Sequence, residues 1–134
     1  MSQKTEAVQY QGSAGSYRVL VVDDEEVVRL VLGELLQSEF LLALLANAES
    51  AVPYLLHSSP HVIVLDKNLP GCSGIEFLRQ AKALSPFTEV IIITGYASLD
   101  SALEALRFGA FDYLLKPFEN LDIILEKVRR AAEK

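Results

Sequence analysis

The stretch VIVLDKNLPG, residues 62–71, decides the fold of this chain. Four apolar residues lead directly into Asp66, and a Leu-Pro-Gly turn follows shortly after it. A short continuous apolar run bounded by turn residues is typical of a strand that is buried on both faces. Such strands belong to parallel sheets covered by helices on both sides. The stretch therefore predicts a central strand with a carboxylate, Asp66, at its carboxyl end.

Outward from this strand, strand-like and helix-like segments alternate along the chain. The expected strands are 18–22, 40–46, 61–65, 89–94 and 111–116. The expected helices are 25–37, 47–58, 73–84, 98–108 and 121–132. In the second of these helices Pro53 is tolerable if Ser50 is the N-cap, and Gly109 is expected to end the fourth. Strict alternation predicts an α/β fold, a flavodoxin-like (βα)5 three-layer sandwich whose five-stranded parallel sheet has the order 2-1-3-4-5.

Length and composition exclude several classes of protein. The chain has 134 residues, 51% of them hydrophobic, with a net charge of −6, which argues against direct nucleic-acid binding by bulk charge. No apolar run reaches the roughly 18 residues of a membrane span. Cys72 is the single cysteine, so no internal disulfide can form, and a reducing cytoplasm fits. The polar, aperiodic residues 1–16 are expected to be a disordered N-terminal tail, and residues 17–134 one domain.

Polar residues gather at the ends of the expected strands. In open α/β sheets the ligand site lies beyond the carboxyl ends of the strands, at the point where the strand order reverses. The residues placed there are Asp23, Asp24, Asp66, Thr94 and Lys116. Such oxygen-rich carboxylates suit Mg²⁺, and a carboxylate beside a metal can act as a nucleophile toward a phosphoryl group. Taken singly, each could instead be a helix cap, a turn residue or a solvated surface charge.

Four separated motifs resemble the receiver domain of bacterial two-component response regulators. They are VLVVDDE (19–25), VIVLDKNLPGCSGIEFL (62–78), VIIITGYAS (90–98) and GAFDYLLKPF (109–118). The sequences TGYAS and FDYLLKPF within these motifs are most similar to those of receivers from NtrC-type activators and hybrid kinases. The resemblance implies that Asp66 is the phospho-acceptor and that Mg²⁺ is held by Asp23, Asp24, Asp66 and the backbone carbonyl of Asn68. It also implies a switch role for Thr94 and Tyr113, a phosphoryl-binding role for Lys116, and a cis peptide bond between Lys116 and Pro117.

The resemblance further implies a phosphoryl-accepting switch, with no enzymatic activity beyond self-catalysed uptake and loss of the phosphoryl group. The expected partners are a sensor histidine kinase or a phosphotransfer protein, an output domain in a longer protein, and a second copy on activation. No nucleic acid or membrane is expected to bind this domain directly. The expected signalling face comprises the fourth helix, the fifth strand and the last helix. Its surface available to partners is expected to include Leu99, Tyr113, Phe118 and Glu119. Leu103 and Leu106 are expected to lie in the core.

Three other functions remain for comparison. A pseudo-receiver would dock partners without phosphorylation, although the complete acidic set argues against it. An aspartate-nucleophile phosphatase of the haloacid-dehalogenase type normally has a second aspartate two residues after the first, where this chain has Asn68. A flavodoxin needs a phosphate-cradling loop after the first strand, where this chain has DDEE.

Overall fold

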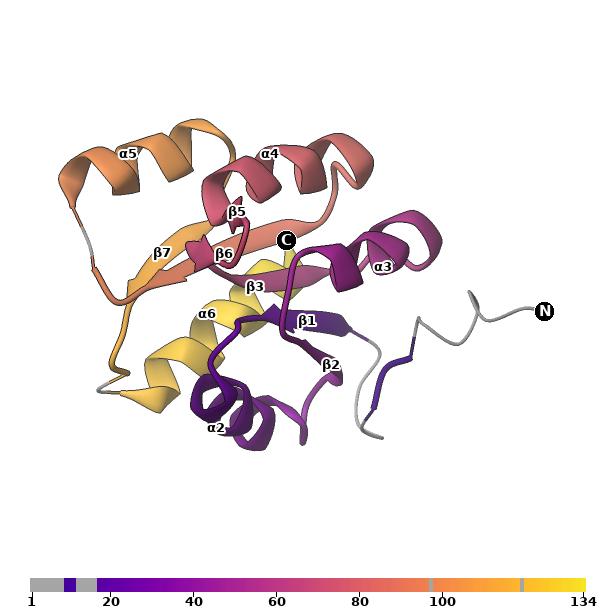
Figure 1. Ribbon diagram of the computed structural model, residues 1–134. Helices are drawn as coiled ribbons and strands as arrows, with labels where there is room; N and C mark the ends of the chain where they lie inside the picture. The colour runs from indigo at the N-terminus through magenta and orange to yellow at the C-terminus, as the bar shows by residue number, and fades with distance from the viewer. Residues whose placement is uncertain (1–8, 12–16, 97, 119) are drawn as a thin grey trace.

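The computed structural model describes residues 9–11, 17–96, 98–118 and 120–134 (Figure 1). Five strands, β1 (Arg18–Val22), β2 (Leu41–Leu45), β3 (Val62–Asp66), β6 (Glu89–Thr94) and β7 (Asp112–Leu115), form a single sheet. All four neighbouring pairs are parallel, and the order is β2-β1-β3-β6-β7. Counting only these five strands along the chain, this is the predicted order 2-1-3-4-5.

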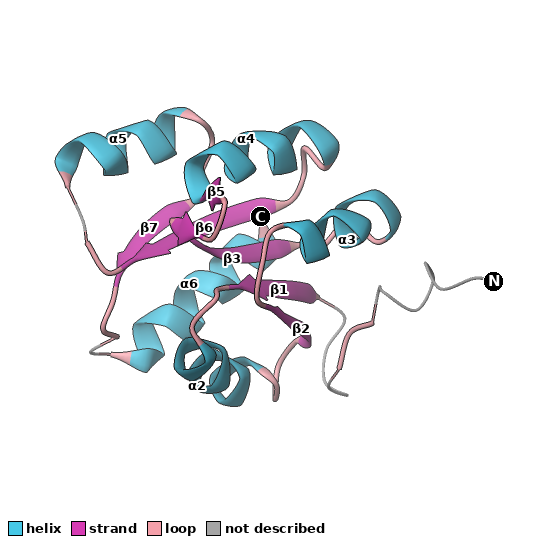
Figure 2. Cartoon of the chain, in the orientation of Figure 1, coloured by secondary structure: helices cyan, strands magenta, loops and turns pink. Residues whose placement is uncertain are grey.

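Helices cover both faces of the sheet, as Figure 2 shows. α3 (Val52–His57), α4 (Gly74–Leu84) and α5 (Leu99–Arg107) lie on one side, and α2 (Glu26–Leu36) and α6 (Leu121–Glu133) on the other. Successive strand residues point to opposite faces, so the apolar runs fill two separate cores. Leu20, Ile63 and Ile92 pack under α3 and α4, whereas Val21, Val64 and Ile91 pack against α2 and α6. This double burial explains why the sequence shows continuous apolar runs.

Local signals fix several helix ends. The side chains of Ser73, Ser98 and Asn120 each accept a backbone hydrogen bond at the start of α4, α5 and α6. At the end of α5, Gly109 has a φ of 102°, and the following N–H of Ala110 donates to the carbonyl of Ala105 at 3.0 Å. This is a Schellman arrangement, which confirms Gly109 as the residue that ends the helix.

The segment after β2 differs from the expectation of one helix capped by Ser50. A 3-10 turn, η1 (Glu49–Ala51), comes first and α3 begins only at Val52. Asn47 takes the capping role, because its Oδ1 accepts the N–H of Ser50 at 2.9 Å. Pro53 therefore lies in the first turn of α3, where its missing N–H leaves no helical hydrogen bond unmade.

Two further features were not expected from the sequence. A small antiparallel hairpin, β4 (Asn68–Leu69) with β5 (Cys72–Ser73), follows Asp66 and leads into α4. Leu103 and Leu106 are 49% and 50% exposed, so their expected place in the core is wrong. They lie on the outer side of α5, because the helix contacts the sheet through Ala105.

The expected N-terminal tail falls mostly on residues outside the described ones. Within it, however, Gln9–Gln11 contact the domain. Gln11 pairs with Leu42 on the edge strand β2, and the hydroxyl of Tyr54 hydrogen-bonds to the backbone of Gln9. Tyr10 packs edge-on against the ring of Tyr54 with ring centroids 5.3 Å apart. These three residues are therefore packed, because a free sheet edge and an aromatic surface offer them partners.

Candidate functional site

Three carboxylates meet at the carboxyl ends of the two central strands. Asp23 directly follows β1, Asp24 comes next, and Asp66 is the last residue of the neighbouring strand β3. One carboxylate oxygen from each lies within 4.8 Å of the others. Asp23 is 0% exposed and Asp66 only 4%, whereas Asp24 is exposed. The parallel register therefore brings Asp66 next to the adjacent pair Asp23 and Asp24, from which the sequence separates it by more than 40 residues.

Asp23 is held by the chain around it. Its Oδ1 accepts the N–H of Glu25 at 2.8 Å, and its backbone carbonyl accepts a hydrogen bond from Arg29 at 2.7 Å. Its Oδ2 is buried and makes no hydrogen bond within the described chain, although it forms an ion pair with Lys116, 2.9 Å away. A buried carboxylate oxygen without a hydrogen-bond donor is costly unless a cation lies beside it.

Lys116 supplies a positive charge to the acidic cluster from the loop after the edge strand β7. It follows β7, its N–H donates to Thr94 at 2.7 Å, and its peptide bond to Pro117 is cis, as the resemblance implies. Its ammonium contacts Asp23 and Glu25 and lies 3.7 Å from Oδ2 of Asp66. Burial favours a lower pKa for Lys116, but the hydrogen bond to Glu25, the ion pair with Asp23 and the charge of Asp66 raise the pKa overall. Lys116 is therefore a permanent cation in this site.

Asp66 has the most perturbed carboxyl group of the site. Burial raises the pKa of Asp66 from 3.8 to about 6, and the nearby charge of Asp23 acts in the same direction. The N–H of Asn68, which donates to Oδ1 of Asp66 at 3.2 Å, and the ammonium of Lys116 partly oppose this rise. A strand-end carboxylate that is poorly solvated and held by a backbone N–H is a candidate nucleophile.

Thr94 and Tyr113 lie on the neighbouring strands β6 and β7, at the side of the sheet beyond β3. Thr94 ends β6 and is fully buried, and its hydroxyl donates to the carbonyl of Tyr96 at 3.0 Å while accepting the N–H of the same residue at 3.1 Å. The hydroxyl of Tyr113 on β7 is buried and has no hydrogen-bond partner among the described residues. Thr94 is thus bonded within its own loop, and Tyr113 retains an unused donor.

The sequence reasoning missed three residues that build the site. Glu25 was noted only as part of an acidic run, yet it shares the ammonium of Lys116 with Asp23. Gly74 lies so close to the backbone of Asp66 and Lys67 that a Cβ there would stand 2.6 Å from the Cα of Lys67. Lys67 itself extends to α5 and donates to the hydroxyl of Ser101 at 2.8 Å. Of these three residues, only Gly74 has a signal in the sequence. It is a glycine eight positions after Asp66, at the expected start of a helix.

The donor set fits a hard divalent cation. Carboxylate oxygens from three residues lie within 4.8 Å of one another, and Oδ2 of Asp23 is buried with no hydrogen bond among the described residues. Mg²⁺ is usually bound in proteins by one or two carboxylates with several waters, at oxygen-only sites of this kind. Asp23, Asp24 and Asp66 are therefore the residues that can hold such an ion, and the backbone of Asn68 lies next to them.

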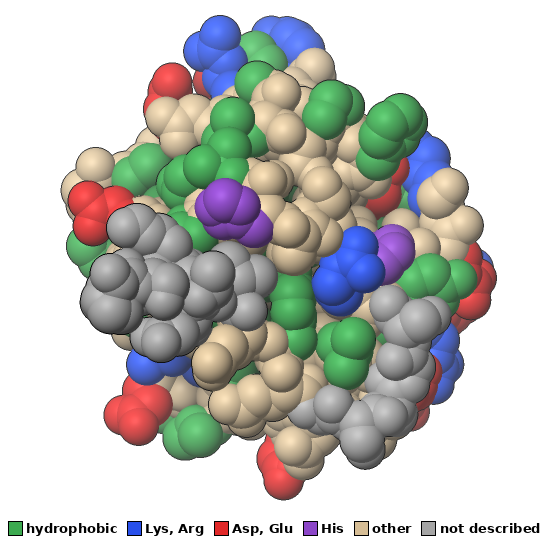
Figure 3. All heavy atoms as spheres, turned by 90° about the vertical axis from the view of Figure 1, so that its right-hand side faces the viewer, with side chains coloured by type: hydrophobic (Ala, Val, Ile, Leu, Met, Phe, Trp, Pro, Cys, Tyr) green, Lys and Arg blue, Asp and Glu red, His purple; other side chains and the backbone are tan. Residues whose placement is uncertain are grey.

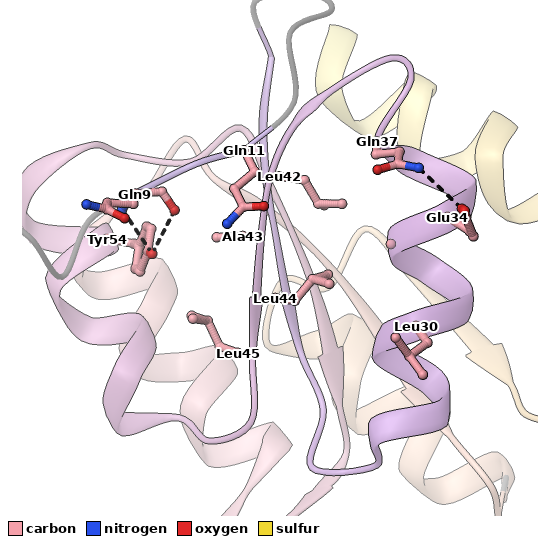
Figure 4. Close-up of a pocket in the computed structure, with 11 residues that line it drawn as sticks. Gln9, Gln11, Leu30, Glu34, Gln37, Leu42, Ala43, Leu44, Leu45 and Tyr54 are labelled. Atoms are coloured by element: carbon pink, nitrogen blue, oxygen red, sulfur yellow. Dashed lines mark hydrogen bonds between the residues drawn. The ribbon is translucent and has the colours of Figure 1, made fainter.

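Among the described residues, no second cluster of acidic groups of this kind is found. A groove of about 630 Å³ follows the edge strand β2, between residues of α2 and Tyr54 of α3, and its lining includes Leu30, Leu44 and Leu45 (Figure 4). Of the described residues that line it, Glu34 alone is charged. The face at the amino ends of the strands shows histidines among apolar groups, with a basic side chain beside one of them and acidic groups mainly at its margins (Figure 3). None of the described helices is both long and apolar enough to cross a membrane.

Comparisons with known proteins identify what this arrangement resembles. The family model of the response regulator receiver domain matches residues 19–129. The chain is 38% identical to the DNA-binding transcriptional regulator NtrC of Salmonella typhimurium, over 84% of this chain and 24% of NtrC. It is 36% identical to the transcriptional regulatory protein FixJ of Rhizobium meliloti, over 87% of this chain and 57% of FixJ. The chain thus spans a quarter of the length of NtrC and little more than half that of FixJ.

The fold has a matching solved structure as well. The BeF3-activated receiver domain of DrrB superposes with a TM-score of 0.81 at 34% identity, covering 88% of this chain and 98% of that domain. The residues that the family model matches, 19–129, include the acidic cluster, Thr94 and Lys116.

Proposed function

The chain belongs to the response regulator receiver domain family, and from that premise we propose that it is a phosphoryl-accepting switch of a two-component system, phosphorylated on Asp66. The carrying observation is the position of the Asp66 carboxyl group: nearly buried at the end of β3, beside the orphaned oxygen of Asp23 and within 3.7 Å of the ammonium of Lys116. Two buried carboxylates and an ammonium that lie close together support a site for a phosphoryl group and a metal ion.

The chemistry follows from these groups. An oxygen of Asp66 attacks the phosphorus of a phosphohistidine on a sensor histidine kinase or phosphotransfer protein; the P–N bond breaks, a P–O bond forms, and the imidazole takes up a proton. Mg²⁺ held by Asp23, Asp24, Asp66 and the carbonyl of Asn68 would offset the negative charge that accumulates between the carboxylates and the phosphoryl group. The ammonium of Lys116 contributes a second positive charge that would offset the charge of the phosphoryl group.

The switch step concerns Thr94 and Tyr113. The Thr94 hydroxyl, now bonded to Tyr96, turns to donate to a phosphoryl oxygen, and the loop between β6 and α5 follows it. Tyr113 adjusts with the loop, because its hydroxyl has no competing partner among the described residues. A local charge change thereby biases an element with two arrangements.

The proposed signalling face is made of α5, β7 and α6. Three leucines one turn apart on α5, Leu99, Leu103 and Leu106, are 74%, 49% and 50% exposed, so this face carries apolar surface as well as charge. The proposed binding partners of this face are an output domain in a longer protein or a second copy of the chain. Uptake and loss of the phosphoryl group are self-catalysed, with no turnover of other substrates. The proposed location is the cytoplasm, which is consistent with membership of the response regulator receiver family.

The decisive test is intact-mass measurement after incubation with Mg²⁺ and acetyl phosphate. We expect a gain of one phosphoryl group that is lost in Asp66→Asn and retained in Asp112→Asn, a control that removes a carboxylate from outside the site. No adduct on the wild-type protein, with no Mg²⁺-dependent binding of beryllofluoride, would favour a pseudo-receiver. Turnover of p-nitrophenyl phosphate that depends on Asp66 would favour a phosphatase instead.

A further inference from the structure

Lys67, the residue directly after the proposed phospho-acceptor, connects the acidic site to α5. Its Nζ donates to the hydroxyl of Ser101 at 2.8 Å, across 34 residues of sequence. No carboxylate lies within ion-pair distance of this ammonium among the described residues, so a neutral hydroxyl is its partner. The contact joins the loop after β3 to the first turn of a helix on the proposed signalling face.

The backbone of Lys67 is fixed on both sides. Its N–H donates to the carbonyl of Ile93 on β6 at 2.8 Å, and its carbonyl accepts the N–H of Gly74 at the start of α4 at 2.6 Å. Gly74 also leaves no space for the Lys67 backbone to shift toward α4. The base of the lysine side chain therefore stays in place relative to Asp66, and any relative movement must occur at its Ser101 end.

The Ser101 end belongs to a hydroxyl network at the start of α5. Ser98, the N-cap, accepts the N–H of Ser101 at 3.1 Å and donates from its own hydroxyl to that of Ser101 at 3.0 Å. The segment between Thr94 and this N-cap is the loop that follows Thr94 in the proposed switch step. Thr94 holds its near end through Tyr96, and Lys67 holds its far end through Ser101.

The electrostatics make this contact weak enough to be broken. The N-terminus of a helix carries partial positive charge, so an ammonium there is disfavoured by the helix dipole. Asp100 in the first turn of α5 offsets part of this effect. A charge-assisted hydrogen bond under these conditions stabilises one position of the loop only modestly. The bond can therefore break when the loop moves.

We propose that Lys67 is a positioning residue that restrains the resting arrangement of the β6–α5 loop through Ser101. The inference rests on the proposed function, because the restrained loop is the one that must move when Asp66 carries a phosphoryl group. On this proposal the bond is absent from the phosphoryl-binding arrangement, so its removal raises the fraction of molecules with the loop in that arrangement. The apparent affinity for a phosphoryl analogue increases in proportion to that fraction.

Ser101→Ala tests the proposal with all charges kept. With Mg²⁺ present, we expect the apparent Kd for beryllofluoride to fall by about three- to tenfold, the effect of losing one charge-assisted hydrogen bond at a partly exposed position. Ser101→Thr retains a hydroxyl and should restore the wild-type value. In a Lys67→Met background, Ser101→Ala should produce no further change, because the two residues act through one contact.

A second readout needs neither metal nor analogue. Ala102 donates its N–H to the carbonyl of Ser98, so hydrogen exchange of the Ala102 amide reports opening of the first turn of α5. We expect this exchange to be about three- to tenfold faster in both Lys67→Met and Ser101→Ala than in the wild type, with Ser101→Thr unchanged.

The outcomes separate the two hypotheses. A wild-type protein that binds no beryllofluoride contradicts the proposed function, and the exchange measurement then decides the restraint alone. A wild type that binds it, with Kd and exchange unaltered by Ser101→Ala, overturns the restraint and leaves the proposed function intact. An effect of Ser101→Ala that persists at full size in the Lys67→Met background also overturns it, because Ser101 would then act without Lys67.

Discussion

The ammonium of Lys116 lies 2.9 Å from Oδ2 of Asp23, so that the last loop of the sheet neutralises a carboxylate at the end of its first strand. The two residues are far apart in sequence, and each lies at the carboxyl end of a different parallel strand. This oxygen is the one that has no hydrogen bond among the described residues. A metal ion bound at the acidic cluster would therefore compete with Lys116 for this carboxylate.

This competition predicts the effect of Lys116→Met on metal affinity. Removing a positive charge beside Asp23 and Asp66 should tighten Mg²⁺ binding by about three- to tenfold, because the ion no longer displaces an ammonium or meets its repulsion. Labelling by acetyl phosphate should slow, because the cation that offsets phosphoryl charge is lost. Titration calorimetry with Mg²⁺ measures the first effect, with Lys127→Met as a control for loss of a lysine elsewhere. Weaker Mg²⁺ binding in Lys116→Met would contradict the competition.

The raised pKa of Asp66 predicts how stability depends on pH in metal-free protein. Because the folded-state pKa of Asp66, about 6, exceeds the ordinary value of 3.8, this carboxyl group lowers stability progressively as the pH rises from 3.8 to 6, and the full loss is present above pH 6. Asp66→Asn should therefore be more stable than the wild type at pH 7.5, by about 1 to 3 kcal/mol. The difference should shrink as the pH falls through the window between 6 and 3.8, where the wild-type carboxyl takes up its proton.

Urea denaturation in the presence of EDTA at pH 7.5 and pH 4 measures this difference. Asp112→Asn serves as the control, since its carboxylate forms an ion pair with Lys127 away from the site. A wild-type protein as stable as Asp66→Asn at pH 7.5 would show that the Asp66 carboxylate is well solvated, against the burial observed.

The close packing at Gly74 predicts a large effect of a single methyl group. A Cβ at this position would overlap the carbonyl of Asp66 and stand 2.6 Å from the Cα of Lys67. Because both neighbours are backbone atoms fixed in the sheet, Gly74→Ala should lower the free energy of unfolding by about 1 to 3 kcal/mol. Gly95→Ala is the matched control, since nothing lies within 4 Å of a Cβ there. Equal stabilities of the two variants would contradict the packing.

The exposed leucines of α5 predict that a substitution there affects association of the protein but hardly changes its stability. Leu103 is about half exposed, so Leu103→Gln should change the free energy of unfolding by less than about 1 kcal/mol. If activated molecules pair through this face, the same substitution should weaken the association of beryllofluoride-treated protein about tenfold in sedimentation velocity. Leu84→Gln, which changes a leucine of similar exposure on α4, should leave that association unaltered.

The elements that the sequence predicted well are those with strong local signals. Ser73, Ser98 and Asn120 cap helices through their own side chains, and Gly109 adopts the positive φ that ends α5, so four helix boundaries are encoded within a few residues. The third helix was less predictable. Ser50 is as good a cap by type as Asn47, and only the path of the chain after β2 selects the asparagine.

The burial of the α5 leucines could not be read from the sequence. Leu99, Leu103 and Leu106 form an apolar stripe that is as typical of a core face as of an exposed one. The choice depends on how the helix is rotated on the sheet, and here Ala105 occupies the contact. A small residue at the contact brings the helix close and turns the leucines outward.

The sequence by itself determined the alternation of strands and helices, and with it the edge of the sheet at which Asp23, Asp66, Thr94 and Lys116 would meet. Periodicity and capping are local properties, and parallel crossovers have a fixed hand, so the topology follows from them. Only the tertiary structure decided which of these groups touch. Glu25 shares Lys116, Gly74 approaches Asp66, and Lys67 extends to Ser101, because contacts between loops depend on strand register and on the distance between packed helices, which no short stretch of sequence specifies.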